Sequence, residues 1–452
     1  MAGDLLVQNA TMILPKRVAI GDLRVVGGKI EAVAPGGGLD AKDGESVIDG
    51  TGLHLLPGAI DPHVHFREPG NYDKEDLESG SRAAASGGVT SFLDMPNNSP
   101  NTTNKATLQS KIQRASNKVV THHGFFIGAT KNNLNDLQSV EGMDGLCGIK
   151  IFMGNSTGDL LVHEQKDLEN IFSNTSGIIA THAEDEERLQ HRIEKFKDRT
   201  DIRAHAECRD AKCAMIATKR AVALAKDHDH RLHVVHLTSA EEANWLVKNK
   251  GDLVTTEVCT HHLSFNQEDV ERLGPRGLVN PPIRYEEDRS TLWKRLKDGT
   301  IDCVVTDHAP HTLEAKSKGY PSAPAGMPGV ETSLPLMLTH AKNGRCSFSD
   351  VVKWMCEGPA RVYGIEKKGS LIEGFDGDLA IVDLERKRIV ADDQTWTRVQ
   401  WSPYEGMELT GWPTHTVVDG NVVHRRHHHG GVKGEPVALP GSAGRVLTFR
   451  AQ

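Results

Sequence analysis

Two histidines separated by one residue mark the segment of this chain best suited to chemistry. His63 and His65 lie in DPHVHFREPG, directly after the apolar run 55–60. Residues two apart in an extended strand point to the same face, so both imidazoles would project toward one point, where they could bind one metal ion. The alternative, for this pair alone, is a surface strand with two incidental histidines.

Four further residues with metal-binding potential each follow a short β-branched run. They are Lys150 in GIKIFMG, His182 in ATHAED, His236 in HVVHLTS and Asp307 in VVTDHAPH. Barrel enzymes assemble their sites from side chains at the ends of several parallel strands, which converge on one mouth. The repeated pattern therefore favours a metal site over incidental surface histidines.

The elements that would position these residues alternate from about residue 58, with apolar strands followed by amphipathic helical stretches such as 74–86, 107–116 and 209–226. The strand candidates are 59–63, 89–94, 119–127, 148–152, 177–182, 232–236, 253–258 and 302–306. Alternation of this kind predicts βα units and a parallel sheet. Eight such strands predict an α/β fold of the (β/α)8 TIM-like barrel class.

Both ends of the chain are rich in short glycine-punctuated strands, for example 22–26 and 29–33 on either side of Gly27 and Gly28. We expect these ends to pair into one small β-sandwich domain beside the barrel. The predicted division is 1–57 and 363–429 for the two parts of the small domain, 58–362 for the barrel and 430–452 for a loosely held tail. The histidine run 427–429 is interpreted as an exposed polar run rather than a metal site.

Composition limits the class of protein. The 452 residues are 25% charged and 38% hydrophobic with a formal net charge of −8, which excludes global disorder and any basic footprint for nucleic acid or anionic lipid. The N-terminus has no long apolar core, so we expect no signal peptide, no membrane span and a cytoplasmic location. The seven cysteines contain no CxxC pair, and Cys147, Cys259 and Cys303 are expected to be small buried hydrophobes.

The number of candidate ligands indicates more than one metal. Neutral imidazole and carboxylate are good zinc ligands, and five of them exceed what one tetrahedral ion with an open position needs. Two cations require an anionic bridge, and Lys150 is the candidate if it reacts with carbon dioxide to form a carbamate. The alternative for Lys150 is a solvent-facing strand end.

The ordered set HxH, Lys, His, His, Asp resembles the metal-dependent amidohydrolase superfamily, and the flanking words resemble its dihydroorotase branch of cyclic amidohydrolases. The similarity runs from about Gly58 to APAGMPGVETSLPLML. The resemblance implies two Zn²⁺ ions per chain, the more buried one held by His63, His65 and Asp307, the more exposed one by His182 and His236, with carbamylated Lys150 between them.

The resemblance also implies which residues bind substrate. Arg67 follows His65 by two residues, Asn97 lies in DMPNN and His311 follows Asp307 by four, and together they would hold the carboxylate of dihydroorotate. Asn280 in LVNPPIR matches a position near the pyrimidine ring, although NPP also marks a turn. The alternative for Arg67 is an ordinary surface ion pair.

The expected reaction is reversible hydrolysis of (S)-dihydroorotate to N-carbamoyl-L-aspartate in de novo pyrimidine (UMP) biosynthesis. A hydroxide bridging the metals would attack the ring carbonyl, and Asp307 would act as general base and then as general acid. The partner is a small molecule, and the family adds a homodimer and association with aspartate transcarbamoylase as expectations.

Three alternatives stay open. Allantoinase and hydantoinase or dihydropyrimidinase use the same metals on other cyclic amides, but the first typically has asparagine at the position of Arg67 and the second lacks MPNN. A non-catalytic dihydroorotase-like scaffold would show lost ligands, and this sequence has lost none. The loop 312–326 is interpreted either as a mobile lid or as an ordinary surface loop.

Overall fold

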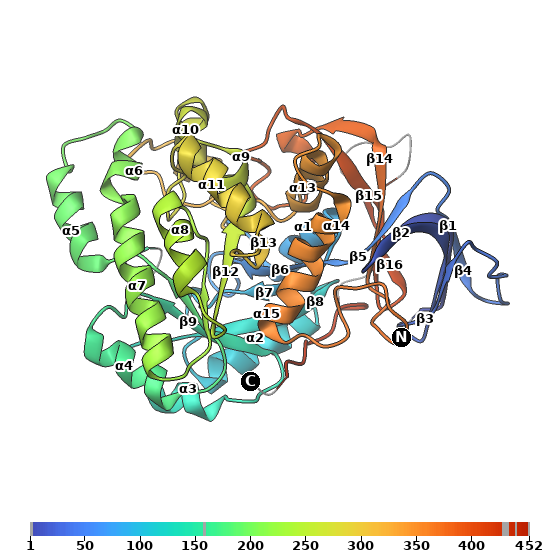
Figure 1. Ribbon diagram of the computed structural model, residues 1–452, viewed down its shortest axis with the longest axis horizontal. Coiled ribbons are helices and arrows are strands. Elements are labelled where there is room, and N and C mark those ends of the chain that lie inside the picture. Colours follow the sequence, from blue (N-terminus) through green and yellow to red (C-terminus); the bar gives the residue numbers. More distant parts are fainter. Residues whose placement is uncertain (1–2, 157–159, 427–433, 439–440, 451–452) are drawn as a thin grey trace.

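The computed structural model of the chain describes residues 3–156, 160–426, 434–438 and 441–450. Figure 1 shows a barrel that is surrounded by helices and, beside it, a separate mixed sheet. Among the helices within these ranges, none has the length and apolar character needed to cross a membrane.

Eight parallel strands form the barrel, and each is hydrogen-bonded to the next one along the chain. They are β6 (Ala59–Val64), β7 (Val89–Asp94), β8 (His122–Gly128), β9 (Leu146–Phe152), β10 (Ile179–His182), β11 (Leu232–Val234), β12 (Val254–Cys259) and β13 (Cys303–Val305). The ring closes between its first and last strands, where Val64 forms a parallel bridge with His308 and the His65 amide donates to the His308 carbonyl at 2.8 Å. This arrangement confirms the predicted fold class.

Helices follow the strands and cover the outside of the barrel (Figure 1). They are α1 (Leu77–Ser86), α2 (Lys105–Ser116), α3 (Leu134–Ser139), α4 (Gln165–Asn174), α5 (Glu186–Lys195), α6 (Arg203–Cys208), α7 (Ala211–Asp227), α8 (Ala240–Asn249), α9 (Thr260–Ser264), α10 (Gln267–Leu273), α11 (Glu286–Lys297), α12 (Leu313–Lys316), α13 (Ser333–Lys342), α14 (Phe348–Val352) and α15 (Gly358–Tyr363). Short polar side chains start several of them: Asp76, Asn104 and Ser239 each accept a backbone N–H of the first helical turn.

The two ends of the chain form one nine-stranded mixed sheet. Its strands are β1 (Leu5–Leu14), β2 (Arg17–Val26), β3 (Lys29–Pro35), β4 (Ser46–Asp49), β5 (His54–Pro57), β14 (Leu379–Ile389), β15 (Glu408–Val418), β16 (Asn421–Arg425) and β17 (Glu435–Pro436). The junction is β5, which pairs in parallel with β1 and antiparallel with β14. The predicted pairing of both chain ends into one small β domain is therefore confirmed, and its strands form a single mixed sheet.

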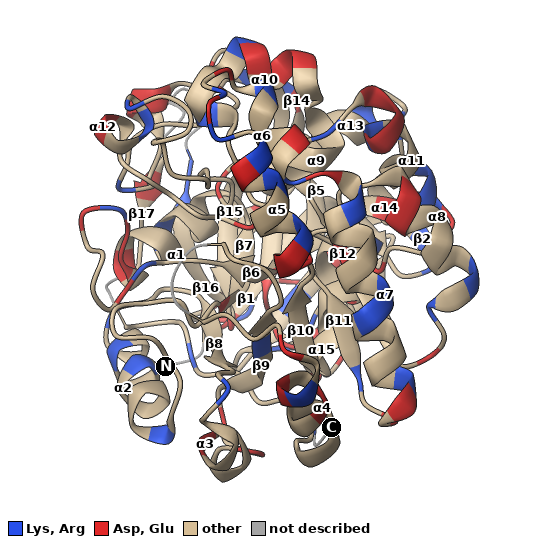
Figure 2. Ribbon diagram, turned by 90° about the vertical axis from the view of Figure 1, so that its left-hand side faces the viewer, with Lys and Arg blue, Asp and Glu red and all other residues tan. Residues whose placement is uncertain are grey.

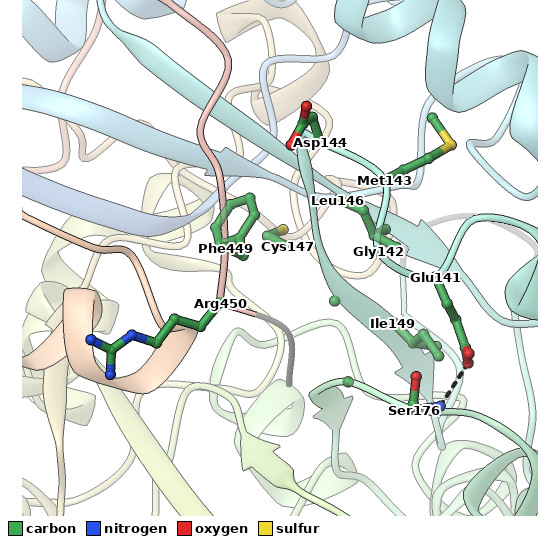
Figure 3. Close-up of a pocket in the computed structure, with 12 residues that line it drawn as sticks. Glu141, Gly142, Met143, Asp144, Leu146, Cys147, Ile149, Ser176, Phe449 and Arg450 are labelled. Atoms are coloured by element: carbon green, nitrogen blue, oxygen red, sulfur yellow. Dashed lines mark hydrogen bonds between the residues drawn. The ribbon is translucent and has the colours of Figure 1, made fainter.

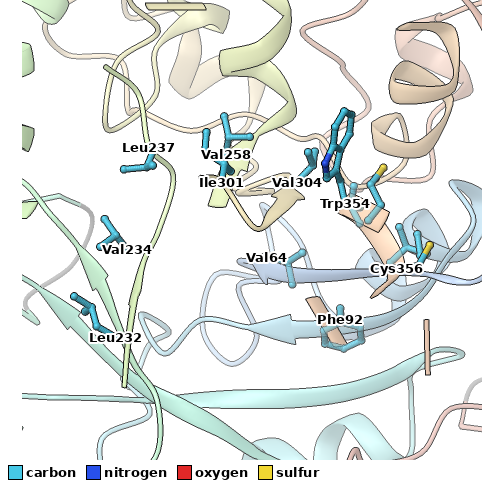
Figure 4. Close-up of a cluster of buried hydrophobic side chains, with 14 of the residues drawn as sticks. Val64, Phe92, Leu232, Val234, Leu237, Val258, Ile301, Val304, Trp354 and Cys356 are labelled. Atoms are coloured by element: carbon cyan, nitrogen blue, oxygen red, sulfur yellow. The ribbon is translucent and has the colours of Figure 1, made fainter. Parts of the chain in front are cut away.

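Neighbouring residues on a barrel strand belong to different apolar clusters. Phe92 and Phe125 pack in the cluster that includes the outer helices, whereas Leu93 and Phe126 pack in a second cluster on the opposite strand face. Figure 4 shows the first cluster, where Val64, Phe92, Val258 and Val304 lie near Trp354. Burying each such side chain contributes roughly 1.5–3 kcal/mol.

The second cluster contains Cys147, Cys259 and Cys303. All three are free thiols and fully buried, which confirms their prediction as small buried hydrophobes.

Within the described part of the C-terminal tail, Leu447 anchors the segment 441–450 to the barrel. Leu447 is 1% exposed, its amide donates to the His123 carbonyl at 2.9 Å, and its carbonyl accepts from Gly145 at 3.0 Å. Figure 3 shows Phe449 beside Cys147, where both line a pocket with Arg450. The few apolar side chains of this glycine-rich segment pack against an apolar surface of the barrel. The run 427–429 lies outside the described residues.

Candidate active site

The carboxyl ends of the barrel strands bring nine of the ten predicted site residues into one pocket. His63 is the penultimate residue of β6, Lys150 lies in β9 and His182 ends β10. His236 and Asp307 each follow their strand by two residues. The pocket is lined by His63, His65, Arg67, Asn97, Lys150, Phe152, Ser156, His182, His236, Asn280, Asp307, Ala309, Ala325 and Gly326. Of the ten, only His311 is not one of these lining residues.

Asp307 faces the first histidine pair. Its Oδ1 lies 3.4 Å from His63 Nε2 and 3.0 Å from His65 Nε2. Burial raises the pKa of Asp307, but attraction to His63 and the hydrogen bond from His65 outweigh it and hold that pKa well below its usual range. These three side chains therefore present two imidazole nitrogens and an anionic oxygen to one point.

The second histidine pair is equally close. His182 Nδ1 lies 2.9 Å from His236 Nε2, and both rings are buried. Burial lowers the pKa of both imidazoles, and for His236 the neighbouring His182 and Lys150 lower it further. A neutral imidazole is the metal-binding form, so this pair also offers ligand nitrogens.

Lys150 is a buried cation without a hydrogen bond. It is 1% exposed, and no described residue offers its Nζ a hydrogen-bond partner. Burial lowers its pKa from 10.5 to about 8, while attraction to Glu257 and Asp307 partly opposes this. Lys150 makes a cation–π contact instead: its Nζ lies 5.1 Å from the centroid of the Phe152 ring. An unsatisfied buried amine is costly, and a neutral amine is the form that reacts with carbon dioxide.

Arg67 lies at the pocket wall and is 4% exposed. Its Nε donates to the Pro310 carbonyl at 3.2 Å, and its Nη2 lies 3.3 Å from His311 Nε2. Burial lowers its pKa to about 10, although several carboxylates attract it. Within the described part of the chain, no carboxylate lies within 4.0 Å of the guanidinium. The alternative interpretation of Arg67, as one half of an ordinary surface ion pair, therefore does not fit the structure.

The remaining predicted residues have partners in the same region. Asn97 Oδ1 lies 2.7 Å from His65 Nδ1, and Asn280 Nδ2 donates to Ser156 Oγ at 3.4 Å. Asn97 thus contacts a histidine as well as lining the pocket. The loop 312–326 is anchored beside the site, because buried Lys316 donates to the carbonyls of Leu278 and Pro324 at 3.2 and 2.9 Å.

Two buried glutamates that the sequence reasoning missed contact the histidines. Glu257 Oε1 lies 2.5 Å from His63 Nδ1, and Glu184 Oε2 lies 2.9 Å from His182 Nε2. Burial raises the pKa of both carboxyls, but the interaction of Glu257 with His63 and the attraction of Glu184 to Arg209 outweigh burial and lower each pKa to about 2. An acidic residue inside the strand VTTEVC was the available signal for Glu257.

Three pocket residues have strained backbones. Arg67, His236 and Asp307 have φ of 61°, 41° and 47°, in the left-handed region that side-chain-bearing residues rarely adopt. Such strain costs of order 1–3 kcal/mol per residue and clusters at functional sites. The fold thus holds these side chains in place against a local preference.

Two further histidine pairs, His122–His123 and His261–His262, lie outside the pocket lining. His122 Nε2 lies 3.0 Å from Asp378 Oδ1, in a buried charge cluster that reaches Lys368 and Arg445. His262 Nε2 bonds the Pro281 carbonyl at 3.2 Å. Figure 2 shows acidic and basic residues interspersed over the outer helices such as α5 and α11.

The sequence of this chain is similar to a known protein family and to individual members of it. A model described as the amidohydrolase family matches residues 54–158 and 164–423. A dihydroorotase of Methanothermobacter thermautotrophicus is 35% identical over 430 residues, covering 93% of this chain and 94% of that protein. A dihydroorotase of Bacillus subtilis is 33% identical over 416 residues, covering 89% and 94%.

Solved structures with this fold include hydantoinases. The L-hydantoinase (dihydropyrimidinase) of Arthrobacter aurescens aligns with a TM-score of 0.91 and 30% identity, covering 99% of this chain and 100% of that one. The dihydropyrimidinase of Brevibacillus agri aligns with a TM-score of 0.88 and 27% identity. Sequence and structural similarity thus point to cyclic amides of different kinds.

Proposed function

This chain belongs to the amidohydrolase family and is a metal-dependent cyclic amidohydrolase, and from that premise we propose that it is a dihydroorotase. The proposed reaction is reversible hydrolysis of (S)-dihydroorotate to N-carbamoyl-L-aspartate. The relatives named dihydroorotase, which cover most of the chain at 31–35% identity, support this choice.

The observation that carries the proposal is the state of Arg67. A guanidinium that is 4% exposed, lines the pocket and has no carboxylate within 4.0 Å among the described residues needs an anion. Arginine binds carboxylates through two parallel hydrogen bonds, which makes it selective for them. Dihydroorotate carries such a carboxylate and unsubstituted hydantoin does not. In this proposal Asn97 and His311 complete the carboxylate site and Asn280 contacts the ring.

The residues fit a two-metal centre. His63, His65 and Asp307 would hold one Zn²⁺, and His182 and His236 the other, with Lys150 as a carbamate between them. The unsatisfied Nζ of Lys150 and the closely spaced imidazole nitrogens support this assignment. Bound zinc would supply Lewis-acid chemistry, since it lowers the pKa of water and polarises a carbonyl.

The side chains of the chain would perform the proton transfers and hold the substrate. Asp307 would accept the proton of the attacking water and deliver it to the leaving amide nitrogen, so that one carboxylate acts in turn as base and acid. Arg67 and its neighbours would fix the ring so that its amide carbonyl faces Asp307. The buried walls of the pocket would exclude bulk water during these steps.

The boundaries and setting of the enzyme are part of the proposal. We place the barrel at 58–362, which agrees with β5 ending at Pro57 in the mixed sheet and β6 starting at Ala59. De novo pyrimidine biosynthesis, a cytoplasmic location, a homodimer and association with aspartate transcarbamoylase are inferred from the family.

Hydantoinase activity is the second candidate, because the solved structures include hydantoinases that align over 99% of the chain. Turnover of dihydroorotate, hydantoin and allantoin by the purified protein, with zinc counted on the same sample, separates the two. Dihydroorotate hydrolysis with about two metals per chain is expected. Turnover of hydantoin or allantoin alone would overturn the assignment of Arg67, Asn97 and His311.

A further inference from the structure

One buried carboxylate accepts hydrogen bonds from both halves of the proposed metal centre. Glu257 lies in β12 and is 0% exposed. Its Oε1 lies 2.5 Å from His63 Nδ1 and accepts from the His236 backbone amide at 3.2 Å. Its Oε2 lies 3.0 Å from His233 Nε2. Three strands, β6, β11 and β12, therefore meet at one side chain.

The contact with His63 decides which ring nitrogen faces the pocket. A carboxylate at Nδ1 makes that nitrogen the donor, so Nε2 keeps its lone pair. Nε2 is the atom that faces Asp307, at 3.4 Å. A carboxylate behind a ligand histidine fixes both its tautomer and the orientation of its ring.

The contact with His236 acts on the backbone. His236 has a φ of 41°, and its amide donates to Glu257 at the position where β11 has just ended. A left-handed residue persists only where the surrounding structure holds it. The same oxygen that orients His63 thus also holds the strained turn from which the His236 ring projects.

The other ligand histidines have separate partners. His65 Nδ1 contacts Asn97, and His182 Nε2 contacts Glu184, whose second partner is Arg209. Each of these contacts reaches one half of the centre only. Glu257 is distinguished from them because it bonds residues of both halves.

We propose that Glu257 is a positioning residue that couples the two metal subsites, so that loss of its carboxylate weakens both. The inference rests on the metal centre of the proposed function. His233, which is also hydrogen-bonded to Thr255 Oγ1 at 2.8 Å, contacts the other oxygen of the carboxylate and so restrains its orientation.

The test is a titration of the metal-free full-length protein with Co²⁺, followed by the visible absorption of the bound ion and by competition with a chelator. Two binding constants are obtained for the wild type and for Glu257→Gln, which keeps the volume of the side chain. Two variants serve as comparisons. Among the proposed ligand histidines, Glu184→Gln affects His182 alone. Glu242→Gln removes an equally buried carboxylate whose partners are Thr218 and Ser239.

In Glu257→Gln both constants should weaken by about 10- to 100-fold, the usual range for residues behind metal ligands. Glu184→Gln should weaken one constant, and Glu242→Gln neither. Weakening of a single constant by Glu257→Gln, or of none, would overturn the coupling. Should Glu257→Gln fail to fold by circular dichroism, Glu257→Asp replaces it and must also weaken both.

The result can be told apart from failure of the proposed function. Metal binding is measured without substrate, so a wrong substrate leaves this test intact. A wild-type protein that binds no Co²⁺ or Zn²⁺ would remove the metal centre, and the coupling with it.

Discussion

All the residues proposed as metal ligands are buried, and burial favours the neutral form of a histidine, which is the form that binds metal. His63, His65, Lys150, His182, His236 and Asp307 are between 1% and 9% exposed. Burial lowers the pKa of His65 to about 4, and it lowers that of His182 as well. These rings are therefore neutral at pH 7 and need not lose a proton before they bind a cation.

Asp307→Asn tests the proton carrier. An amide cannot accept and return a proton, so turnover of dihydroorotate should fall by about 10²- to 10⁴-fold while zinc is partly retained. Steady-state kinetics and metal analysis on one sample measure both. Asp302→Asn is the matched control, since Asp302 precedes the same strand at its other end and pairs with Lys250. Near-normal turnover in Asp307→Asn would refute the assigned role.

Arg67→Gln tests recognition of the carboxylate. Removing the guanidinium should raise KM for dihydroorotate by at least about 10-fold, because a charged hydrogen bond contributes roughly 1.5–3 kcal/mol. Any slow turnover of hydantoin, which lacks the carboxylate, should be unaffected. Arg295→Gln, at a buried arginine on α11, should change neither. An equal loss for both substrates in Arg67→Gln would argue for a structural role.

Among the elements, the C-terminal segment 441–450 contacts the barrel through backbone hydrogen bonds and a few apolar side chains. Its glycines and prolines predict a loosely held chain, yet residues 441–450 bond to the ends of β8 and β9 opposite the site. Val446 and Leu447 supply the apolar contacts, and Gly124 and Gly145 leave room for the segment on the barrel. A few apolar side chains within a polar segment are therefore sufficient to hold it against an apolar surface that the barrel already provides.

Leu447→Ala tests this packing. Loss of a buried leucine side chain should lower the free energy of unfolding by about 2–5 kcal/mol. Val437→Ala is the control, because Val437 is 47% exposed and its substitution should have little effect. Thermal unfolding followed by circular dichroism compares the two. Turnover at 25 °C should be unchanged in both, and equal melting curves would mean that the segment contributes nothing.

At the scale of the whole molecule, a buried charge cluster joins the barrel, the mixed sheet and the C-terminal segment. Asp378 binds Lys368 and His122, and Arg445 binds Asp376 at 2.6 Å and Asp419 at 3.1 Å. Breaking such a buried pair from one side leaves an uncompensated charge, which costs about 3–5 kcal/mol. These contacts hold the two layers together at the end of the barrel remote from the site.

The Asp378 carboxyl makes this junction sensitive to acid. Burial raises its pKa, but attraction to His122 and Lys368 outweighs burial and holds the pKa well below its ordinary 3.8. The carboxylate therefore stabilises the fold fully above pH of about 4, and this contribution is lost as the pH falls toward the folded-state value. Asp378→Asn should melt several degrees lower than the wild type at pH 7, and the gap should narrow below pH 4. Asp393→Asn, an exposed position, should show no gap, and a gap in Asp378→Asn that ignores pH would contradict the linkage.

Metal removal tests the centre in the intact protein. Dialysis against a zinc chelator should abolish turnover and lower the melting temperature, since ligands that bind only the folded state stabilise it. Zinc with bicarbonate should restore activity, whereas zinc in carbon dioxide-free buffer should restore it slowly or not at all if Lys150 must be carbamylated. Equal recovery in both buffers would refute the carbamate. Protein dialysed without chelator is the control.

The sequence by itself determined the class of fold and the strand-end histidines, lysine and aspartate that line the pocket. Both follow from local chemistry: apolar periodicity sets the strands, and a histidine or aspartate at a strand end is carried to the mouth wherever a parallel barrel closes. The eight strand candidates correspond to β6–β13, and nine of the ten predicted site residues line one pocket.

Only the tertiary structure decided which side chains contact and orient those residues. Glu257 and His63 are 194 positions apart, Asn97 contacts His65 across 32, and Leu447 packs beside His123 at the far end of the chain. Such pairings depend on strand order, register and the closure of β13 on β6, and no local pattern carries this information. Residue types and periodicity act over a few positions, whereas the partners that orient a catalytic side chain are chosen by how distant strands come to lie side by side.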